Sequence, residues 1–141
     1  MTDHKDPKLS LRPRLVQAAE AVFKDIRGND KKLKSQLNHL IAVCNEASCD
    51  EEIRLYLRYQ ASRDQAPIKF SLVDKILEEL SKIFGADPSI TDVEKLDAWR
   101  HYAVYLARAF TYYDAKAKAS ASANHSHGSS RANFQPQRGH R

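Results

Sequence analysis

Residues 91–118 read TDVEKLDAWRHYAVYLARAFTYYDAKAK, and they contain the only Trp of the chain and four of its six Tyr. Thr91 and Glu94 form the T-x-x-E pattern of a capping box, which predicts that a helix starts here. Neither Pro nor Gly interrupts the rest of the stretch. We therefore expect one long helix around which the other elements pack.

This helix has two distinct sides when its residues are placed at about 100° intervals. One side is apolar and is the predicted core face, with Leu96, Trp99, Ala103, Leu106, Phe110 and Tyr113. The opposite side alternates rings with a basic group and consists of His101, Tyr105, Arg108 and Tyr112. Two interpretations compete for this second side. Either another helix or subunit covers the rings while Arg108 reaches water, or the side binds nucleic acid through phosphate contacts and stacking.

Length and composition predict a single soluble domain with polar ends. The chain has 141 residues, of which 42% are hydrophobic and 29% charged, as in ordinary globular proteins. No apolar run approaches the roughly 18 residues of a membrane span, and MTDHKDPKLS lacks the apolar region of a signal peptide. We therefore expect a cytoplasmic protein. Cys44 and Cys49 are then expected to be inert thiols, since C-x4-C specifies neither a disulfide nor a metal site.

The net charge of +5 is concentrated at the C-terminal end. Residues 117–141 carry four basic side chains and no acid, so residues 1–116 have a net charge of only +1. Any nucleic-acid binding by the folded part must then come from a local basic patch. One candidate is the KKLK run at 31–34, for which a solvated face and a phosphate contact both remain open.

Helical spacing of apolar residues predicts four further helices, near residues 11–26, 31–47, 49–63 and 72–84. The expected N-terminal caps are Ser10, a Ser48–Glu51 box and a Ser71–Asp74 box, with Phe70 as a staple before the last of them. Leu55 and Tyr59 lie opposite the main apolar stripe of the third of these helices, so we expect that helix to be sandwiched. Gly28-Asn29-Asp30, Pro67 and Pro88 mark loops.

The predicted fold is an all-α compact bundle of about five helices with a disordered basic C-terminal tail. The expected division is a flexible leader at 1–9, a helical bundle domain at 10–118 and a disordered basic tail at 119–141, where Ser, Ala, Asn and Gly dominate. Such a tail suits contact with RNA or DNA.

No motif in the sequence indicates catalysis or a cofactor. The chain has no Gly-rich phosphate loop, HExxH, GxSxG or CxxC pattern. His125 and His127 have neither Cys nor an acid nearby, so we predict no metal site there. We expect a protein that is not an enzyme and needs no cofactor.

Two segments resemble the small helical subunit of the type III-A CRISPR interference complex, the Csm complex. Residues 57–63, LRYQASR, are similar to the L-x-Y-Q-A-G-R signature of that family, with Ser62 where the family commonly has Gly. Residues 102–113, with Lys116 shortly after, resemble its aromatic-rich closing helix, although Ala107 replaces an acid and Tyr113-Asp114 replaces His-Lys. With the helical spacing between them, the resemblance covers about residues 31–116.

The resemblance implies a non-catalytic subunit that lines the path of CRISPR guide RNA and target RNA. Copies would self-associate along a filament with the other subunits of the type III complex, hold the target RNA by its backbone, and have no contact with a membrane. The residues expected to contact RNA are basic: Arg54, Arg58, Arg63, Lys69, Arg100, Arg108 and Lys116.

Some of these residues have competing roles. Arg54 can pair with Asp50 or Glu51, and Arg63 at a helix C-terminus can bind carbonyls or Asp64. Replacing Arg100 and Arg108 together with Ala is expected to weaken RNA binding and leave the fold intact. The competing functions are a helical protein–protein adaptor without nucleic acid and, less consistent with the loops, a DNA-binding helix-turn-helix module.

Overall fold

The structure, a computed structural model, describes residues 7–26 and 31–139, with side chains at 11–26 and 31–122. These residues form helices and loops and no strand, which confirms the prediction of an all-α bundle of about five helices. The helices are α1 (Pro7–Phe23), α2 (Lys31–Glu46), α3 (Asp50–Ser62), α4 (Phe70–Ala86) and α5 (Asp92–Gly139). Residues 1–6 of the predicted leader at 1–9 lie outside the described residues, as does the predicted stop at Gly28-Asn29-Asp30, whereas residues 7–9 belong to α1.

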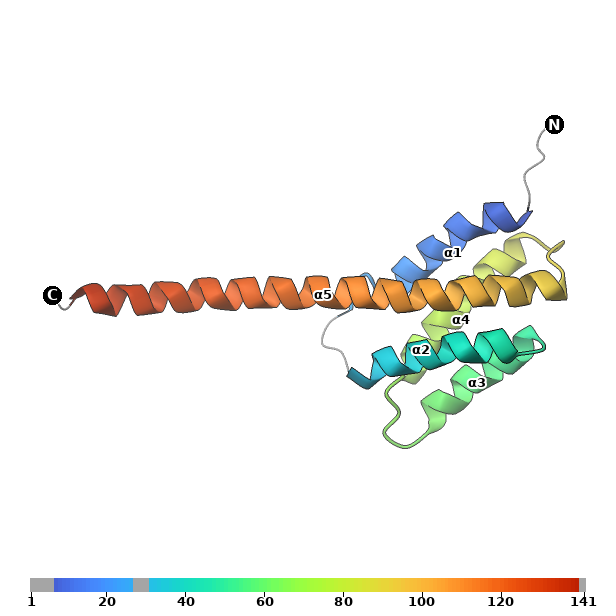
Figure 1. Cartoon of the computed structure of the whole chain (residues 1–141), viewed down its shortest axis with the longest axis horizontal. Helices are drawn as coiled ribbons and strands as arrows, with labels where there is room; N and C mark the ends of the chain where they lie inside the picture. Colours follow the sequence, from blue (N-terminus) through green and yellow to red (C-terminus); the bar gives the residue numbers. More distant parts are fainter. Residues whose placement is uncertain (1–6, 27–30, 140–141) are drawn as a thin grey trace.

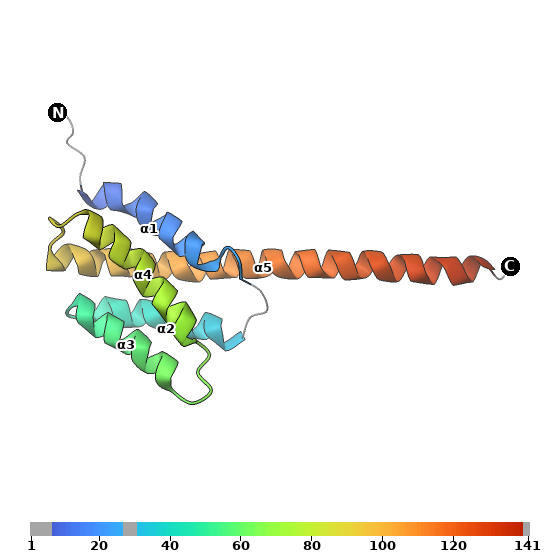
Figure 2. The same cartoon turned by 180° about the vertical axis from the view of Figure 1, so that it is seen from behind.

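The first half of α5 is the axis of the bundle (Figure 1). It packs against α1 on one side and against α2 on the other, while α4 crosses behind it and packs against α1 and α3 (Figures 1 and 2). Buried side chains extend from Leu11 to Phe110, so all five helices contribute to a single core.

The predicted core face of α5 is confirmed. Trp99, Ala103, Leu106 and Phe110 are buried, and Leu96 and Tyr113 pack at the edge of the core. The structure adds Tyr102, which lies beside this stripe and is also buried. Its hydroxyl donates a hydrogen bond to the Ile76 carbonyl at 2.7 Å, and burial raises the pKa of Tyr102 above its ordinary value. A tyrosine can be buried in this way because its polar tip has a partner.

Of the predicted N-terminal caps, only the one at α5 is confirmed. There the Glu94 N–H donates to Thr91 Oγ1 at 3.2 Å and the Thr91 N–H donates to Glu94 Oε1 at 2.9 Å, so the capping box is confirmed. The cap predicted at Ser10 is wrong, because α1 already begins at Pro7. The Ser48–Glu51 box is also wrong, because α3 begins after Cys49 and the Ser48 N–H binds Glu52 instead.

The start of α4 is set by a buried anchor rather than by a side-chain cap. Ile68 is buried in the loop, and the Lys69 carbonyl accepts the first helical hydrogen bonds, from the N–H groups of Leu72 and Val73. The predicted cap at Ser71 is therefore inside the helix. Phe70, the predicted staple, is an exposed residue of the first turn.

The prediction that α3 is sandwiched is wrong. Its inner face is buried through Ile53, Leu57 and Ala61, but Leu55 is 67% exposed and Tyr59 is 58% exposed. The helix covers the bundle from one side only, and its second apolar face meets solvent.

The structure differs from the sequence prediction in the C-terminal segment, where α5 continues as a helix to Gly139. This part extends away from the bundle without a neighbouring helix, and residues 119–122 are exposed (Figures 1 and 2). A helix without tertiary packing is marginal in water, because propensity alone barely offsets the entropy of ordering. Disorder of this segment in isolation therefore stays a prediction.

Deleting residues 119–141 is expected to leave the melting temperature of the bundle unchanged within about 2 °C, since exposed positions away from the core contribute little to stability. Thermal unfolding followed by circular dichroism checks this. Leu106→Ala, which opens a cavity in the buried face of α5, is a positive control. A marked drop in melting temperature on truncation would mean that the segment packs on the bundle.

Candidate nucleic-acid interface

A groove between α2 and α5 holds the polar and aromatic side chains of most interest. Its volume is about 480 Å³ and its lining residues are Asn38, Ile41, Val104, Ala107, Arg108, Thr111 and Tyr112. Of these, the apolar Ile41, Val104 and Ala107 are partly buried and form the floor. The remaining four are exposed and form the rim. We call this feature the α2–α5 groove.

Basic side chains on both helices border this groove. Arg108 is exposed on α5 and makes no hydrogen bond or ion pair with any residue that the structure describes. Lys34 is exposed and precedes Asn38 by one helical turn, so helix geometry places it on the same side of α2. Of the KKLK run, Lys34 is therefore on the side of the groove, whereas Lys32 lines a hollow on the opposite side of α2.

Tyr112 forms the aromatic wall of the groove and is 56% exposed. The Lys116 ammonium lies 5.8 Å from the centroid of its ring, and Tyr113 contacts it edge-on with centroids 4.8 Å apart. The two tyrosines on the aromatic side of α5 therefore differ in their exposure to solvent. Tyr112 is open to solvent, whereas Tyr105 is partly buried against the core, as the interpretation of a covering helix predicts.

A second hollow lies on the other side of α2, where α3 ends. It measures about 420 Å³ and is lined by Lys32, Ser35, Gln36, Arg63, Asp64, Gln65, Ala66 and Pro67. Gln65 has a φ of 56°, in the left-handed region, which turns the chain sharply after α3. Arg63 donates to Gln60 Oε1 at 2.9 Å, rather than to a carbonyl or Asp64. Opposite sides of α2 thus line two hollows, each of which contains an arginine.

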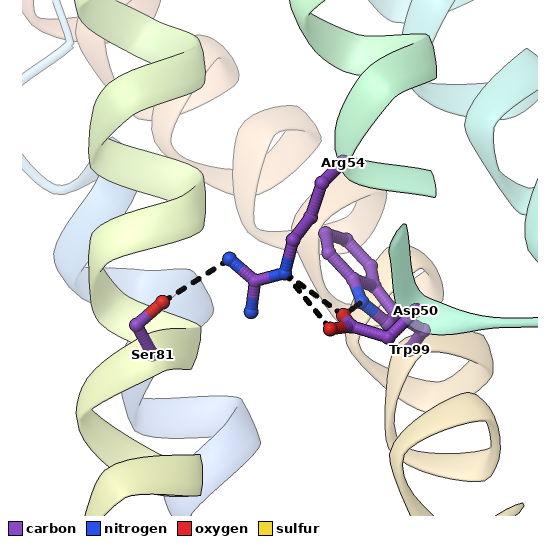
Figure 3. Close-up of polar contacts among 4 residues, drawn as sticks. All are labelled: Asp50, Arg54, Ser81 and Trp99. Atoms are coloured by element: carbon purple, nitrogen blue, oxygen red, sulfur yellow. Dashed lines mark hydrogen bonds and ion pairs between the residues drawn. The ribbon is translucent and has the colours of Figure 1, made fainter. Parts of the chain in front are cut away.

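Arg54 is placed inside the bundle rather than on an open surface (Figure 3). Its Nε donates to both carboxylate oxygens of Asp50 at 2.9 and 3.0 Å, and its Nη1 donates to Ser81 Oγ at 3.2 Å. Asp50 also accepts a hydrogen bond from the Trp99 indole N–H at 2.6 Å. This network joins α3, α4 and α5. Of the two partners that the sequence allowed for Arg54, Asp50 and Glu51, the structure shows Asp50.

Arg100 also has a structural partner. Its Nε donates to the Cys44 carbonyl at 3.2 Å and so satisfies a terminal carbonyl of α2 from α5. Burial raises the pKa of the Cys44 thiol to about 12, and the positive charge of Arg100 lowers this pKa by a smaller amount. Replacing Arg100 would therefore disturb the packing of α2 on α5, and Arg108 alone is the cleaner position for testing RNA binding.

The residues predicted to contact RNA thus differ in whether they lie at one of the two hollows. Arg108 lines the α2–α5 groove, and Lys116 lies over the ring of Tyr112 at its rim. Arg63 and Lys32 line the second hollow. Arg58 is exposed on α3, and Lys69 is the residue before α4; neither lines these hollows. Asn38 was not predicted as a contact, whereas Lys34 belongs to the KKLK run, for which a phosphate contact was left open. The signal that could have found Asn38 is the helical spacing that joins it to Lys34.

Two other kinds of feature, a metal site and a membrane-spanning helix, are absent from the residues that the structure describes. Within that part of the chain, no three His, Cys, Asp or Glu residues gather in a way that could hold a metal ion. The side chains of His125 and His127 lie outside it. None of the helices there combines the length and the apolar character needed to cross a bilayer. The chain matches no family model, no curated protein and no solved structure.

Proposed function

We propose that this protein is a non-catalytic, cytoplasmic RNA-binding subunit that holds RNA by its backbone along α2 and α5. The observation that carries the proposal is the α2–α5 groove, where Arg108 and the exposed Tyr112 lie one turn apart on α5 beside an apolar floor. Positive charge and an exposed ring in one groove are the two features that single-stranded nucleic acids need.

Local charge supports this proposal better than overall charge does. The folded part is nearly neutral, so attraction for phosphate must come from side chains such as Arg108 and Lys34. Phosphate contacts position a nucleic acid but read no bases. A protein of this kind would hold RNA whose sequence is selected elsewhere, by base pairing.

The finer proposal is that the protein is the small subunit of a type III-A CRISPR complex, and it rests on the two motifs. In the first motif Leu57, Gln60 and Ala61 are buried, while Arg58 and Tyr59 are exposed. The partners would be guide RNA, target RNA, the other type III subunits and further copies of this chain. A pull-down from the native host, with mass spectrometry and RNA sequencing, tests it. Recovery of protein partners without any RNA would contradict it.

The RNA-binding proposal predicts a change in salt dependence. Replacing Lys34 and Arg108 together with Ala should weaken binding of single-stranded RNA and lower the slope of log K against log salt by about 1.4, since each single-strand phosphate contact contributes about 0.7. Fluorescence anisotropy with a labelled RNA over a range of salt concentrations measures both quantities.

Arg12 and Arg14 provide a control matched in charge. Both are exposed on α1, which lies on the other side of α5 from α2 (Figure 1). Replacing both with Ala removes the same net charge but should leave affinity and slope close to those of the unaltered protein. Equal losses in the two double variants would indicate non-specific attraction and remove the groove from the proposal.

The adaptor function is the second candidate, and a specific observation favours it. Leu55 and Tyr59 are one turn apart on α3 and both are largely exposed, as expected of a face that docks a partner helix. This function predicts little RNA affinity at any salt concentration. The same titrations therefore distinguish it from RNA binding.

A further inference from the structure

We propose that the α2–α5 groove holds a single unpaired nucleotide, with its base stacked on Tyr112 and its phosphate at Arg108. This inference rests on the proposed RNA-binding function and names what the groove recognises. It specifies which ring stacks on a base, which side chain meets the phosphate, and that one nucleotide fills the groove.

The first argument is the state of the Tyr112 ring. The side chain is 56% exposed although it lines a groove with an apolar floor. Lys116 lies over the ring, with its ammonium 5.8 Å from the centroid, and Tyr113 packs against the ring in a T-shaped arrangement. The ring is thus held in place by its own helix, so little conformational entropy would be lost when a base stacks on it.

The second argument is the fit of the lining to one nucleotide. A groove of about 480 Å³ is in the usual size range of small-ligand sites and combines a mostly apolar floor with a few polar groups. Asn38 carries an amide donor and an amide acceptor on the rim and has no partner among the described residues. The Thr111 hydroxyl donates to the Ala107 carbonyl at 2.9 Å, so only its lone pairs remain for a ligand.

The third argument concerns the charge next to the ring and the preference for single-stranded over duplex RNA. Arg108 occupies the rim one turn before Tyr112, so a phosphate next to a stacked base would meet its guanidinium. Bases inside a duplex are already stacked and cannot offer a face to Tyr112, whereas every unpaired base can. The groove should therefore prefer single strands and tolerate any base.

Tyr112→Leu tests this proposal because it keeps an apolar side chain and removes the π-face. Stacking of one base is worth about 1–3 kcal/mol, so affinity for a labelled oligoadenylate should fall about 5- to 150-fold. Affinity for an RNA duplex should not change. Tyr112→Phe, which retains the ring, should bind within about twofold of the unaltered chain, because the stacking face is conserved.

Tyr59 offers a matched control, since it is 58% exposed on α3 and does not line the groove. Tyr59→Leu should leave affinity for both RNAs unchanged. Thermal unfolding should show both leucine variants folded, because each replaces an exposed side chain.

Three results would overturn the inference in distinguishable ways. If Tyr112→Leu binds single-stranded RNA as well as the unaltered chain, stacking is refuted and the proposed function stands. If it weakens single-strand and duplex binding equally, Tyr112 only shapes the surface around Arg108. If the unaltered chain binds no RNA at low salt, the proposed function and the inference both fail.

Discussion

Asp50→Ala is expected to lower the free energy of unfolding by about 3 kcal/mol. The Asp50 carboxylate accepts hydrogen bonds from Arg54 and from the Trp99 indole N–H, and the Arg54 and Asp50 side chains are only 18% and 14% exposed (Figure 3). Removing the carboxylate leaves a largely buried guanidinium without its counter-charge and an indole N–H without an acceptor. Urea unfolding followed by the fluorescence of Trp99, the only Trp, measures the loss.

Glu51→Ala is the control for this prediction, because Glu51 is the next residue in the first turn of α3 and is exposed. It removes a negative charge from the same helix N-terminus, so it should cost only about 0.5 kcal/mol. Asp50→Asn, which keeps an acceptor for Trp99 but not the charge opposite Arg54, should fall between the two. Similar stabilities for Asp50→Ala and Glu51→Ala would show that the network does not contribute to the fold.

Phe23→Ala is expected to cost about 3–5 kcal/mol, the usual range for removing a buried phenylalanine ring. Phe23 is 1% exposed at the end of α1 and packs edge-on against Phe110 of α5, with ring centroids 5.5 Å apart. Its loss opens a cavity between the two helices and removes a favourable aromatic pair. Guanidinium unfolding followed by circular dichroism measures the cost.

Val16→Ala is the control on the same helix, because Val16 is 36% exposed and leaves no enclosed cavity. We expect it to cost less than about 1 kcal/mol. A loss for Phe23→Ala as small as that of Val16→Ala would indicate that α1 is not docked on α5 in solution. Phe110→Leu, combined with Phe23→Ala, would then report the coupling between the two rings.

The presence of the helices and the core face of α5 could be predicted from the sequence, because both depend on the spacing of apolar residues within one helix. Trp99, Leu106 and Phe110 recur at helical intervals, and any helix formed by this stretch must place them on one side. The capping box at Thr91 is also local, since both partners lie within one turn. These features need no knowledge of the other helices.

The predictions that went wrong depended on neighbours. The start of α4 follows from the burial of Ile68, and the exposure of Leu55 follows from the lack of any described helix on the outer side of α3. Tyr102 is buried because a carbonyl of α4 is available to its hydroxyl. In each case the outcome depends on which other helices pack beside the residue, and spacing within one helix carries no information about that.

The same distinction applies to the candidate site. Helical spacing and composition were enough to predict an α-helical bundle, a nearly neutral folded part and basic residues beside aromatic ones on α5. Which arginines are available depends on how the helices pack. Arg54 and Arg100 bind groups on other helices, whereas Arg108 borders an open groove. The reason is physical: an arginine's charge is fixed by its chemistry, but its partners are fixed by which helices pack beside it.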